Sequence, residues 1–345
     1  MADWHSFGQV AVLGSGSALP GEAIGNDALI ALMASRFGLT REREARLLGE
    51  RLDIGHRHLS RSFEHRHESA RPAHTNSALA AAAIDRALAD AGVDVDDLGY
   101  LIGHTATPDL ILPSNIALVA DRLGYEGPHV ELRQACTGFA NALMIAFGLL
   151  ANPSAGPIAI VGSETGSLLF DPCATEEDVE QRVNMMQMGD GAAAVIITRP
   201  QAGVDLIEAA WFGSIGLGRD PGLRIDSSNP GDNRHDFAGI LAHGHQLFEA
   251  GVAAAGRSGT GIDDVDRIIP HQVSGRIGAQ VANHFGFDPL RCFGNAKRVG
   301  NTGSAAMWLA LDELRHGALL SGQKALFLGA EATKYMHGGF VLERA

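Results

Sequence analysis

The chain has 345 residues, 40 of them acidic and 27 basic, which gives a formal net charge of −13 with the histidines neutral. This acidic balance argues against a general nucleic-acid-binding protein. Hydrophobic residues make up 46% of the chain and charged residues 19%, so the composition is that of a globular protein with a large core and not of a disordered chain.

The cysteine count and the apolar runs indicate the compartment. Cys136, Cys173 and Cys292 are an odd number without a CxxC pair, which argues against a disulfide framework and against a cysteine-rich zinc site. The first residues lack the basic start and apolar stretch of a secretory signal. No apolar run approaches the roughly 20 residues that cross a bilayer. We therefore expect a cytoplasmic protein without membrane contact.

The first predicted element is a buried strand that begins near Gln9 and ends in the glycine turn Gly14-Ser15-Gly16. A dinucleotide-binding loop is excluded, because the third glycine of that motif is out of register and Pro20 follows. The next predicted elements are, in chain order, a charged helix over about residues 41–50, a stretch rich in histidine and arginine over 56–74, an alanine-rich helix over 77–91 and a strand over 100–103.

An internal repeat then determines the predicted architecture. The segment 96–104 matches the segment 263–271, so that His104 corresponds to His271. Three further matches follow in the same order at offsets near 165 residues: Leu123-Gly124-Tyr125 with Phe285-Gly286-Phe287, Ala135-Cys136-Thr137-Gly138 with Gly300-Asn301-Thr302-Gly303, and Glu164 with Glu331. This period is too long for a solenoid, whose repeats run about 20 to 50 residues.

Two fused halves, residues 1–200 and 201–345, account for the repeat. In each half, strand, helix and strand lead to a small-residue turn that opens an apolar helix, over 137–150 and 302–314. Such a succession predicts an α/β fold with a mixed, mostly parallel sheet in each half. A pseudo-twofold axis would bring the turns at Cys136 and Asn301 together.

Three residues at sharp turns carry the predicted chemistry. Cys136 lies at the start of a helix, where the helix dipole and unpaired N–H groups favour a thiolate nucleophile. A buried structural thiol is the alternative. His271 follows a strand at the end where ligands bind in α/β folds, and Asn301 offers an amide N–H that does not titrate. A cysteine, a histidine and an asparagine in this arrangement suit acyl transfer.

Four motifs make the chain resemble the thiolase-fold condensing enzymes, specifically the 3-oxoacyl-(acyl-carrier-protein) synthase III type. They extend the resemblance over nearly the whole chain and are Ala135-Cys136-Thr137-Gly138-Phe139-Ala140, Met188-Gly189-Asp190-Gly191-Ala192-Ala193-Ala194, Pro270-His271-Gln272 with Arg276, and Gly300-Asn301-Thr302-Gly303-Ser304-Ala305-Ala306. The resemblance implies a five-layered αβαβα fold and a homodimer. It also implies acyl-CoA or acyl carrier protein and a malonyl thioester as substrates, with no cofactor and no metal.

The resemblance implies a role for each of the three residues. Cys136 would attack an acyl thioester while its backbone N–H helps to hold the oxyanion. His271 and Asn301 would donate hydrogen bonds to the malonyl thioester, stabilising the enolate that decarboxylation releases. That enolate would attack the acyl group and give a 3-oxoacyl product.

Several positions depart from the family and bear on the substrate. Leu47 stands where acetyl-CoA-dependent members carry a tryptophan that stacks on adenine, although Arg51 could still meet a phosphate. Ser274 replaces the usual asparagine after the histidine-glutamine pair. The glycine-rich loop near the C-terminus is altered, and Gly329 is the candidate for its oxyanion donor. Leu112 aligns with a bulky phenylalanine that a partner subunit inserts in short-chain enzymes, so we expect a medium or long acyl chain.

Other charged and polar signals have simpler interpretations. Two HxH pairs, at 56–58 and 65–67, lack further ligands in a defined pattern, which makes a metal site the minority interpretation. A basic lip for a phosphate or an acidic carrier protein is favoured over a metal site, and a solvated face is an equal alternative for any single arginine; the candidate residues are Arg57, Arg61, Arg66, Arg71, Arg276, Lys297 and Arg298. Asp190 is expected to cap a turn, and Glu164 and Glu331 to hold the central loops.

The leading hypothesis is therefore a condensing enzyme of fatty-acid or specialised-metabolite biosynthesis. One alternative keeps the acyl-Cys136 intermediate but transfers the acyl group to an alcohol, an amine or a carrier protein without decarboxylation. A second alternative is a non-catalytic partner subunit, against which the intact Cys136, His271 and Asn301 argue.

Overall fold

Two half-sheets of the same topology form the frame of the molecule. The computed structural model describes residues 3–65, 72–226 and 229–345. In the N-terminal half the strand order is β6-β5-β7-β8-β2, and in the C-terminal half it is β12-β13-β14-β9. The half-sheets meet where three residue pairs join β2 to β9. A parallel bridge from Ile268 to Cys292 lies where the C-terminal half would carry the counterpart of β6.

The strand bounds agree with the repeat seen in the sequence. The strands of the N-terminal half are β2 (Val10–Ala18), β5 (Tyr100–His104), β6 (His129–Leu132), β7 (Ile158–Glu164) and β8 (Gly191–Thr198). Those of the C-terminal half are β9 (Asp205–Ser214), β12 (Arg267–Pro270), β13 (Lys324–Glu331) and β14 (Met336–Glu343). Among these nine strands, β8 and β14 run against the other strands of their half, because both of their neighbours pair antiparallel. The predicted mixed, mostly parallel sheets are confirmed.

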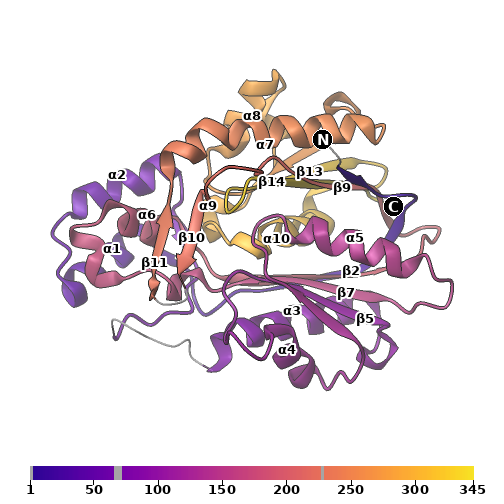
Figure 1. The fold of residues 1–345 in the computed structure, drawn as a ribbon, viewed down its shortest axis with the longest axis horizontal. Coiled ribbons are helices and arrows are strands. Elements are labelled where there is room, and N and C mark those ends of the chain that lie inside the picture. Colours follow the sequence, from indigo (N-terminus) through magenta and orange to yellow (C-terminus); the bar gives the residue numbers. More distant parts are fainter. Residues whose placement is uncertain (1–2, 66–71, 227–228) are drawn as a thin grey trace.

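Helices cover both half-sheets and fill the space between them (Figure 1). The helices are α1 (Asn26–Phe37), α2 (Glu42–Leu52), α3 (Asn76–Ala91), α4 (Asn115–Leu123), α5 (Gly138–Leu150), α6 (Val179–Gln187), α7 (Phe237–Arg257), α8 (Ile277–Phe285), α9 (Ala296–Val299) and α10 (Ala306–Glu313). Helices α3 and α4 lie outside one half-sheet and α7 and α8 outside the other, while α5 and α10 form the middle layer. The predicted five layers are confirmed.

The largest core lies in this middle layer. It joins side chains of α5 and α10 to both half-sheets, and it includes Phe139, Trp308 and Phe340, none of which is exposed. Because both functional turns open directly into α5 and α10, the same packing that forms the core fixes the position of each turn. No helix of the described residues is long and apolar enough to span a bilayer.

The predicted glycine turn after the first strand is wrong. Strand β2 continues through Gly14 and Gly16 to Ala18, and both glycines face α3. A Cβ at Gly14 would lie 2.4 Å from the Ala91 amide nitrogen, and one at Gly16 would lie 2.5 Å from that of Ala87. These glycines therefore permit close packing of a helix on a strand, which the sequence does not distinguish from a turn.

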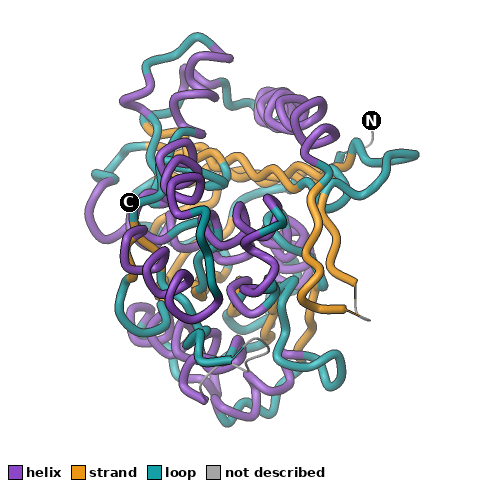
Figure 2. The backbone as a smooth tube through the Cα atoms, turned by 90° about the vertical axis from the view of Figure 1, so that its left-hand side faces the viewer, coloured by secondary structure: helices purple, strands orange, loops and turns teal. Residues whose placement is uncertain are grey.

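A smaller lobe beside the five layers contains α1, α2 and α6 (Figure 1). The short strands β3 (Ile24–Gly25) and β4 (His56–Arg57) pair within it, and β1 (Trp4–His5) pairs with β9. The hairpin of β10 (Leu223–Asp226) and β11 (Asn229–His235) runs along the outside of the molecule (Figure 2).

Two arginines predicted for a basic lip are instead buried inside this region. Arg57 is fully buried and donates hydrogen bonds to Asn26 Oδ1 and to the Met186 carbonyl, at 2.7 and 2.8 Å. Arg61 is 5% exposed, and its Nε donates to the Ser167 carbonyl at 2.6 Å. Buried acceptors from other segments hold both guanidinium groups inside the fold, so a lip is wrong for both. Arg66, Arg71 and His67 lie outside the described residues.

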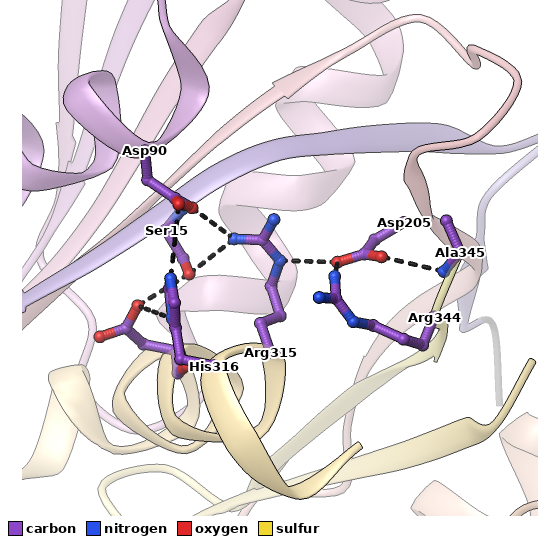
Figure 3. A network of polar contacts seen from close by, with 8 residues as sticks. Ser15, Asp90, Asp205, Arg315, His316, Arg344 and Ala345 are labelled. Carbon is purple, nitrogen blue, oxygen red and sulfur yellow. Dashed lines mark hydrogen bonds and ion pairs between the residues drawn. The ribbon is translucent and has the colours of Figure 1, made fainter. Parts of the chain in front are cut away.

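A polar network fastens the C-terminal end of the chain to the sheet (Figure 3). Asp205, 2% exposed at the start of β9, accepts hydrogen bonds from Arg315 Nε at 2.7 Å, Arg344 Nη1 at 2.5 Å and the Ala345 amide at 3.0 Å. Arg315 also reaches Asp90 at the end of α3, at 2.9 Å. One buried carboxylate thus joins the beginning and the end of the C-terminal half.

Candidate active site

The turn that carries Cys136 joins β6 to α5. The Gly138 amide donates to the Ala135 carbonyl at 3.0 Å and closes the turn around the cysteine. Cys136 is half-buried and precedes the first residue of α5 by two positions. The predicted position of Cys136 at the start of a helix is confirmed, and its role as a nucleophile stays a prediction.

His271 follows β12 directly and is 1% exposed. Its backbone amide donates to the Leu328 carbonyl of β13 at 2.9 Å, which fixes the residue at the strand end. Within the described residues, neither ring nitrogen has a hydrogen-bond partner. Burial lowers the pKa of His271 to about 4, so the ring is neutral at pH 7. A neutral imidazole has one N–H to donate and one nitrogen that accepts.

Asn301 lies in an extended bridge between α9 and α10. Its backbone pairs in parallel with Met188, and its amide donates to the Gln187 carbonyl at 2.8 Å. Its side-chain oxygen accepts from the Gly303 amide at 3.1 Å, which leaves the NH₂ group as the free end of the carboxamide. The side chain is therefore oriented to donate a hydrogen bond.

A single cavity of about 610 Å³ is lined by Cys136, His271 and Asn301. The pseudo-twofold prediction that the two central turns converge is thereby confirmed for these residues. The far wall, formed by helices α7 and α8 and the β10–β11 hairpin, is mostly apolar. Its apolar members are Leu223, Ile225, Ile240, Leu247, Phe248, Ile277, Val281 and Phe285, and its polar members are His235, His245, Gln280 and His284. A second space, lined by residues 106–111 and 133–135 among others, shares Ala135, Leu169 and Thr333 with the first.

Two buried glutamates each accept hydrogen bonds from a residue of the opposite half. Glu331, at the end of β13, accepts from the Thr137 amide at 2.8 Å and from its hydroxyl at 2.7 Å. Glu164, at the end of β7, accepts from the Ser304 amide at 3.1 Å and from its hydroxyl at 2.7 Å. Each glutamate therefore caps the functional turn of the opposite half. The predicted loop-holding role is confirmed.

Burial governs the acidity of the nucleophile. It raises the pKa of the Cys136 thiol well above its ordinary value, and the charges of Glu331 and Glu164 raise it further. Burial likewise raises the pKa of Glu164. The expectation of a favoured thiolate considered the helix dipole and the unpaired N–H groups, but burial has the largest effect on this pKa and opposes the thiolate. The thiol is therefore protonated in the free protein.

Comparison with known proteins agrees with this geometry. Residues 130–214 match the family model of 3-oxoacyl-[acyl-carrier-protein (ACP)] synthase III, and residues 256–342 match that of its C-terminal part. The chain is 30% identical over 252 residues to beta-ketoacyl-[acyl-carrier-protein] synthase III 3 of Streptomyces coelicolor, covering 67% of this chain and 72% of the relative. The chain belongs to the 3-oxoacyl-(acyl-carrier-protein) synthase III family.

Solved structures extend the match to nearly the full length of the chain. The tetronic acid condensing enzyme AbyA1 superposes with a TM-score of 0.84 at 29% identity, covering 97% of this chain and 99% of that one. FabH of Pseudomonas aeruginosa superposes with a TM-score of 0.80 at 27% identity, covering 98% of both chains. The synthase III fold and the condensing-enzyme class are thereby established for this chain.

The five residues of this chain that were predicted to bind substrate do not line the cavity. Leu112 is 85% exposed, and Gly329 lies inside β13, where a Cβ would meet the Phe139 ring at 2.6 Å. Arg276 donates to the Glu50 and Arg51 carbonyls at the end of α2, both at 2.9 Å. Cavity-lining residues adjoin two of the predicted positions: Val273 beside Ser274 and Ala330 beside Gly329. The binding roles of all five stay predictions.

The apolar far wall of the cavity was missed in the sequence. Leu247 and Phe248 of α7 and Ile225 of β10 belong to segments without a recognisable motif. Their sequence pattern predicts only an apolar helix and a short strand, and ordinary core residues have the same pattern. The repeat places α7 on its half-sheet as α3 lies on the other, but it does not indicate which α7 side chains face the cavity.

The raised pKa of Cys136 predicts the pH dependence of its alkylation. Because only the thiolate reacts, the rate of modification of Cys136 by iodoacetamide is expected to keep rising with pH beyond pH 9. Peptide-resolved mass spectrometry measures this rate, with the exposed Cys173 of the same chain as the internal control for reagent access. A rate at Cys136 that levels off below pH 8 would contradict the protonated resting thiol.

Proposed function

We propose that this protein forms a carbon–carbon bond between an acyl group carried on Cys136 and a malonyl thioester. The observation that carries the proposal is the single cavity that brings the Cys136 thiol together with the buried, neutral His271 and the carboxamide of Asn301. Family membership supports the reaction class.

The first step is acylation of Cys136. Its sulfur attacks the carbonyl of an acyl thioester and the carbon–sulfur bond to the carrier breaks, so that the thiol proton leaves with the carrier thiol. The backbone N–H of Cys136 stabilises the oxyanion. We place the second oxyanion donor in the segment 330–333, which follows Gly329 and lines the cavity.

The second step is condensation. Loss of CO₂ from the malonyl thioester leaves an enolate, whose charge is held by hydrogen bonds from His271 and Asn301 to the thioester oxygen. The enolate carbon forms a bond to the acyl carbonyl, and the bond to Cys136 breaks. The released thiolate takes up a proton, and a 3-oxoacyl thioester leaves the site.

The walls of the cavity support an extended acyl substrate. Apolar side chains of α7, α8 and β10 form most of its far side, and about 610 Å³ of space lies between them and the nucleophile. We propose a medium or long acyl chain from acyl-CoA or acyl carrier protein, with Arg51 and Arg276 at the phosphate, in a cytoplasmic homodimer. Leu110, Ile111 and Leu112 are exposed apolar side chains that a second copy would cover.

A second candidate function keeps the acyl-Cys136 intermediate and changes the acceptor. The acyl group would pass to an alcohol, an amine or a carrier protein without decarboxylation. Similarity to a protein described as a tetronic acid condensing enzyme favours keeping this candidate, as do Ser274 and the altered segment 329–339.

Intact-protein mass spectrometry tests both candidates. Wild type and Cys136→Ala are incubated with acyl-CoAs from acetyl to dodecanoyl and then with malonyl-CoA or malonyl carrier protein. Acylation confined to wild type, followed by malonyl-dependent loss of the adduct with release of CO₂, is the expected result. Adducts that only an alcohol, an amine or a carrier thiol discharges would favour the second candidate. No adduct from CoA-linked or carrier-linked acyl groups, in folded protein, would overturn both.

A further inference from the structure

A second histidine stands at the strand end that corresponds to His271. His104 closes β5 as His271 follows β12, and the internal repeat aligns the two. His104 is 1% exposed and does not line the cavity, so it does not touch substrate. A polar ring enclosed this deeply requires partners.

Trp308 of α10 supplies one partner and settles the position of the ring proton. Its Nε1–H donates to His104 Nε2 at 3.0 Å. Because an indole nitrogen can only donate, Nε2 must be the accepting nitrogen and the ring proton is on Nδ1. Burial lowers the pKa of His104 to about 3, so the ring keeps this single proton near pH 7.

The protonated nitrogen lies beneath the nucleophile turn. A Cβ at Gly138 would lie 2.5 Å from His104 Nδ1, and one at Gly162 would lie 2.7 Å from its Cε1. Two glycines therefore leave the space that the ring occupies. Within the described residues Nδ1 has no hydrogen-bond partner, although the Gly138 amide beside it donates to the Ala135 carbonyl and this carbonyl raises the pKa of the ring.

The Ala135 carbonyl belongs to the same peptide group as the Cys136 amide. A peptide group is planar and trans, so its C=O and N–H point in opposite directions. Fixing the Ala135 oxygen on the side of His104 and Gly138 therefore directs the Cys136 N–H away from them. No backbone acceptor within the described residues takes a hydrogen bond from this amide. A donor to the carbonyl also strengthens the N–H of the same peptide group.

We propose that His104 is a positioning residue that donates its Nδ1–H to the Ala135 carbonyl and thereby holds the Cys136 amide as an oxyanion donor. This inference rests on the proposed acylation of Cys136. It assigns Trp308 the task of keeping the proton on Nδ1. It also links the Cys136 turn to α10, the helix that follows Asn301.

Two amide substitutions separate the contacts of His104. His104→Asn places a carboxamide near the position of Nδ1 and can keep the donor to Ala135. His104→Gln reaches the position of Nε2, keeps an acceptor for Trp308 and loses the donor to Ala135. Two rates are measured for each folded variant: acylation of Cys136 by an acyl-CoA that acylates wild type, and alkylation of Cys136 by iodoacetamide, which forms no oxyanion.

We expect His104→Gln to lower the acylation rate at least tenfold and the alkylation rate less than twofold. His104→Asn is expected to stay within about threefold of wild type in both reactions. Unchanged acylation in His104→Gln, or an equal fall in both rates, would overturn the inference while leaving the proposed function intact. A wild-type protein that no acyl thioester acylates would overturn the proposed function and this inference together.

Trp308→Phe provides an independent variant in case the His104 variants do not fold. It keeps an aromatic ring against Phe139 and Phe340 but removes the N–H that fixes the His104 tautomer. The ratio of acylation to alkylation is expected to fall severalfold. An unchanged ratio would contradict the role of the tautomer.

Discussion

Replacing His271 with alanine is expected to slow the malonyl-dependent discharge of acylated Cys136 by about 10² to 10³-fold, the usual cost of removing one oxyanion donor from a preorganised site. The reason is that His271 is buried and neutral, with both ring nitrogens without a partner in the described structure. Its N–H is therefore available to the enolate oxygen. Single-turnover mass spectrometry of pre-acylated protein measures the discharge rate.

Acylation of Cys136 by acyl-CoA is expected to fall much less in His271→Ala, because the enolate forms only in the second step. His284→Ala is the matched control: His284 lines the same cavity but is 43% exposed and contacts Glu249 at its rim. Its discharge rate is expected to stay near that of wild type. Equal losses in the two histidine variants would show a general effect on the cavity and would contradict the assigned role.

Replacing Asp205 with alanine is expected to lower the free energy of unfolding by about 3 to 5 kcal/mol, as for the removal of one partner from a buried ion pair. The substitution leaves Arg315, 9% exposed, without one carboxylate and removes the acceptor of Arg344 and Ala345. The midpoint of denaturant unfolding, followed by circular dichroism, measures the change.

The control for Asp205 is a surface ion pair. Arg298 and Glu313 are 63% and 30% exposed, and Arg298→Ala is expected to cost less than about 1 kcal/mol. Burial opposes ionisation of Asp205, but hydrogen bonds from Ala345 and Arg315 outweigh burial and hold its pKa below the usual value. The contribution of ionised Asp205 to the free energy of unfolding is therefore present above about pH 4 and is lost as the pH falls through the lowered pKa. A difference between Asp205→Ala and wild type that grows on acidification would contradict this account.

The sequence predicted the frame and the three central residues because these features are repeated or sharply local. A duplication near 165 residues predicted the same succession of strands and helices in each half, and small residues around Cys136 and Asn301 indicated turns into helices. The acidity of Cys136 was not predictable in the same way. It depends on its burial and on Glu331 and Glu164, which tertiary packing brings close.

The sequence did not predict the burial or packing role of residues that contact distant segments of the chain. An arginine in a histidine-rich stretch suggests a charged surface, yet Arg57 is fully buried, because Asn26 and the Met186 carbonyl lie within its reach. Similarly, Gly14 and Gly16 have the pattern of a turn, but their role depends on the approach of α3. Only the folded chain shows which acceptors and which helix a residue meets.

Each half supplies the glutamate that caps the central turn of the other half, so the candidate active site needs both halves. Thr137 of the nucleophile turn depends on Glu331, and Ser304 beyond Asn301 depends on Glu164. If the two halves were separated, Thr137 would lose the carboxylate of Glu331 and Ser304 would lose that of Glu164. The turn of each half could therefore change its functional residue only while the glutamate of the other half continued to hold that turn in place.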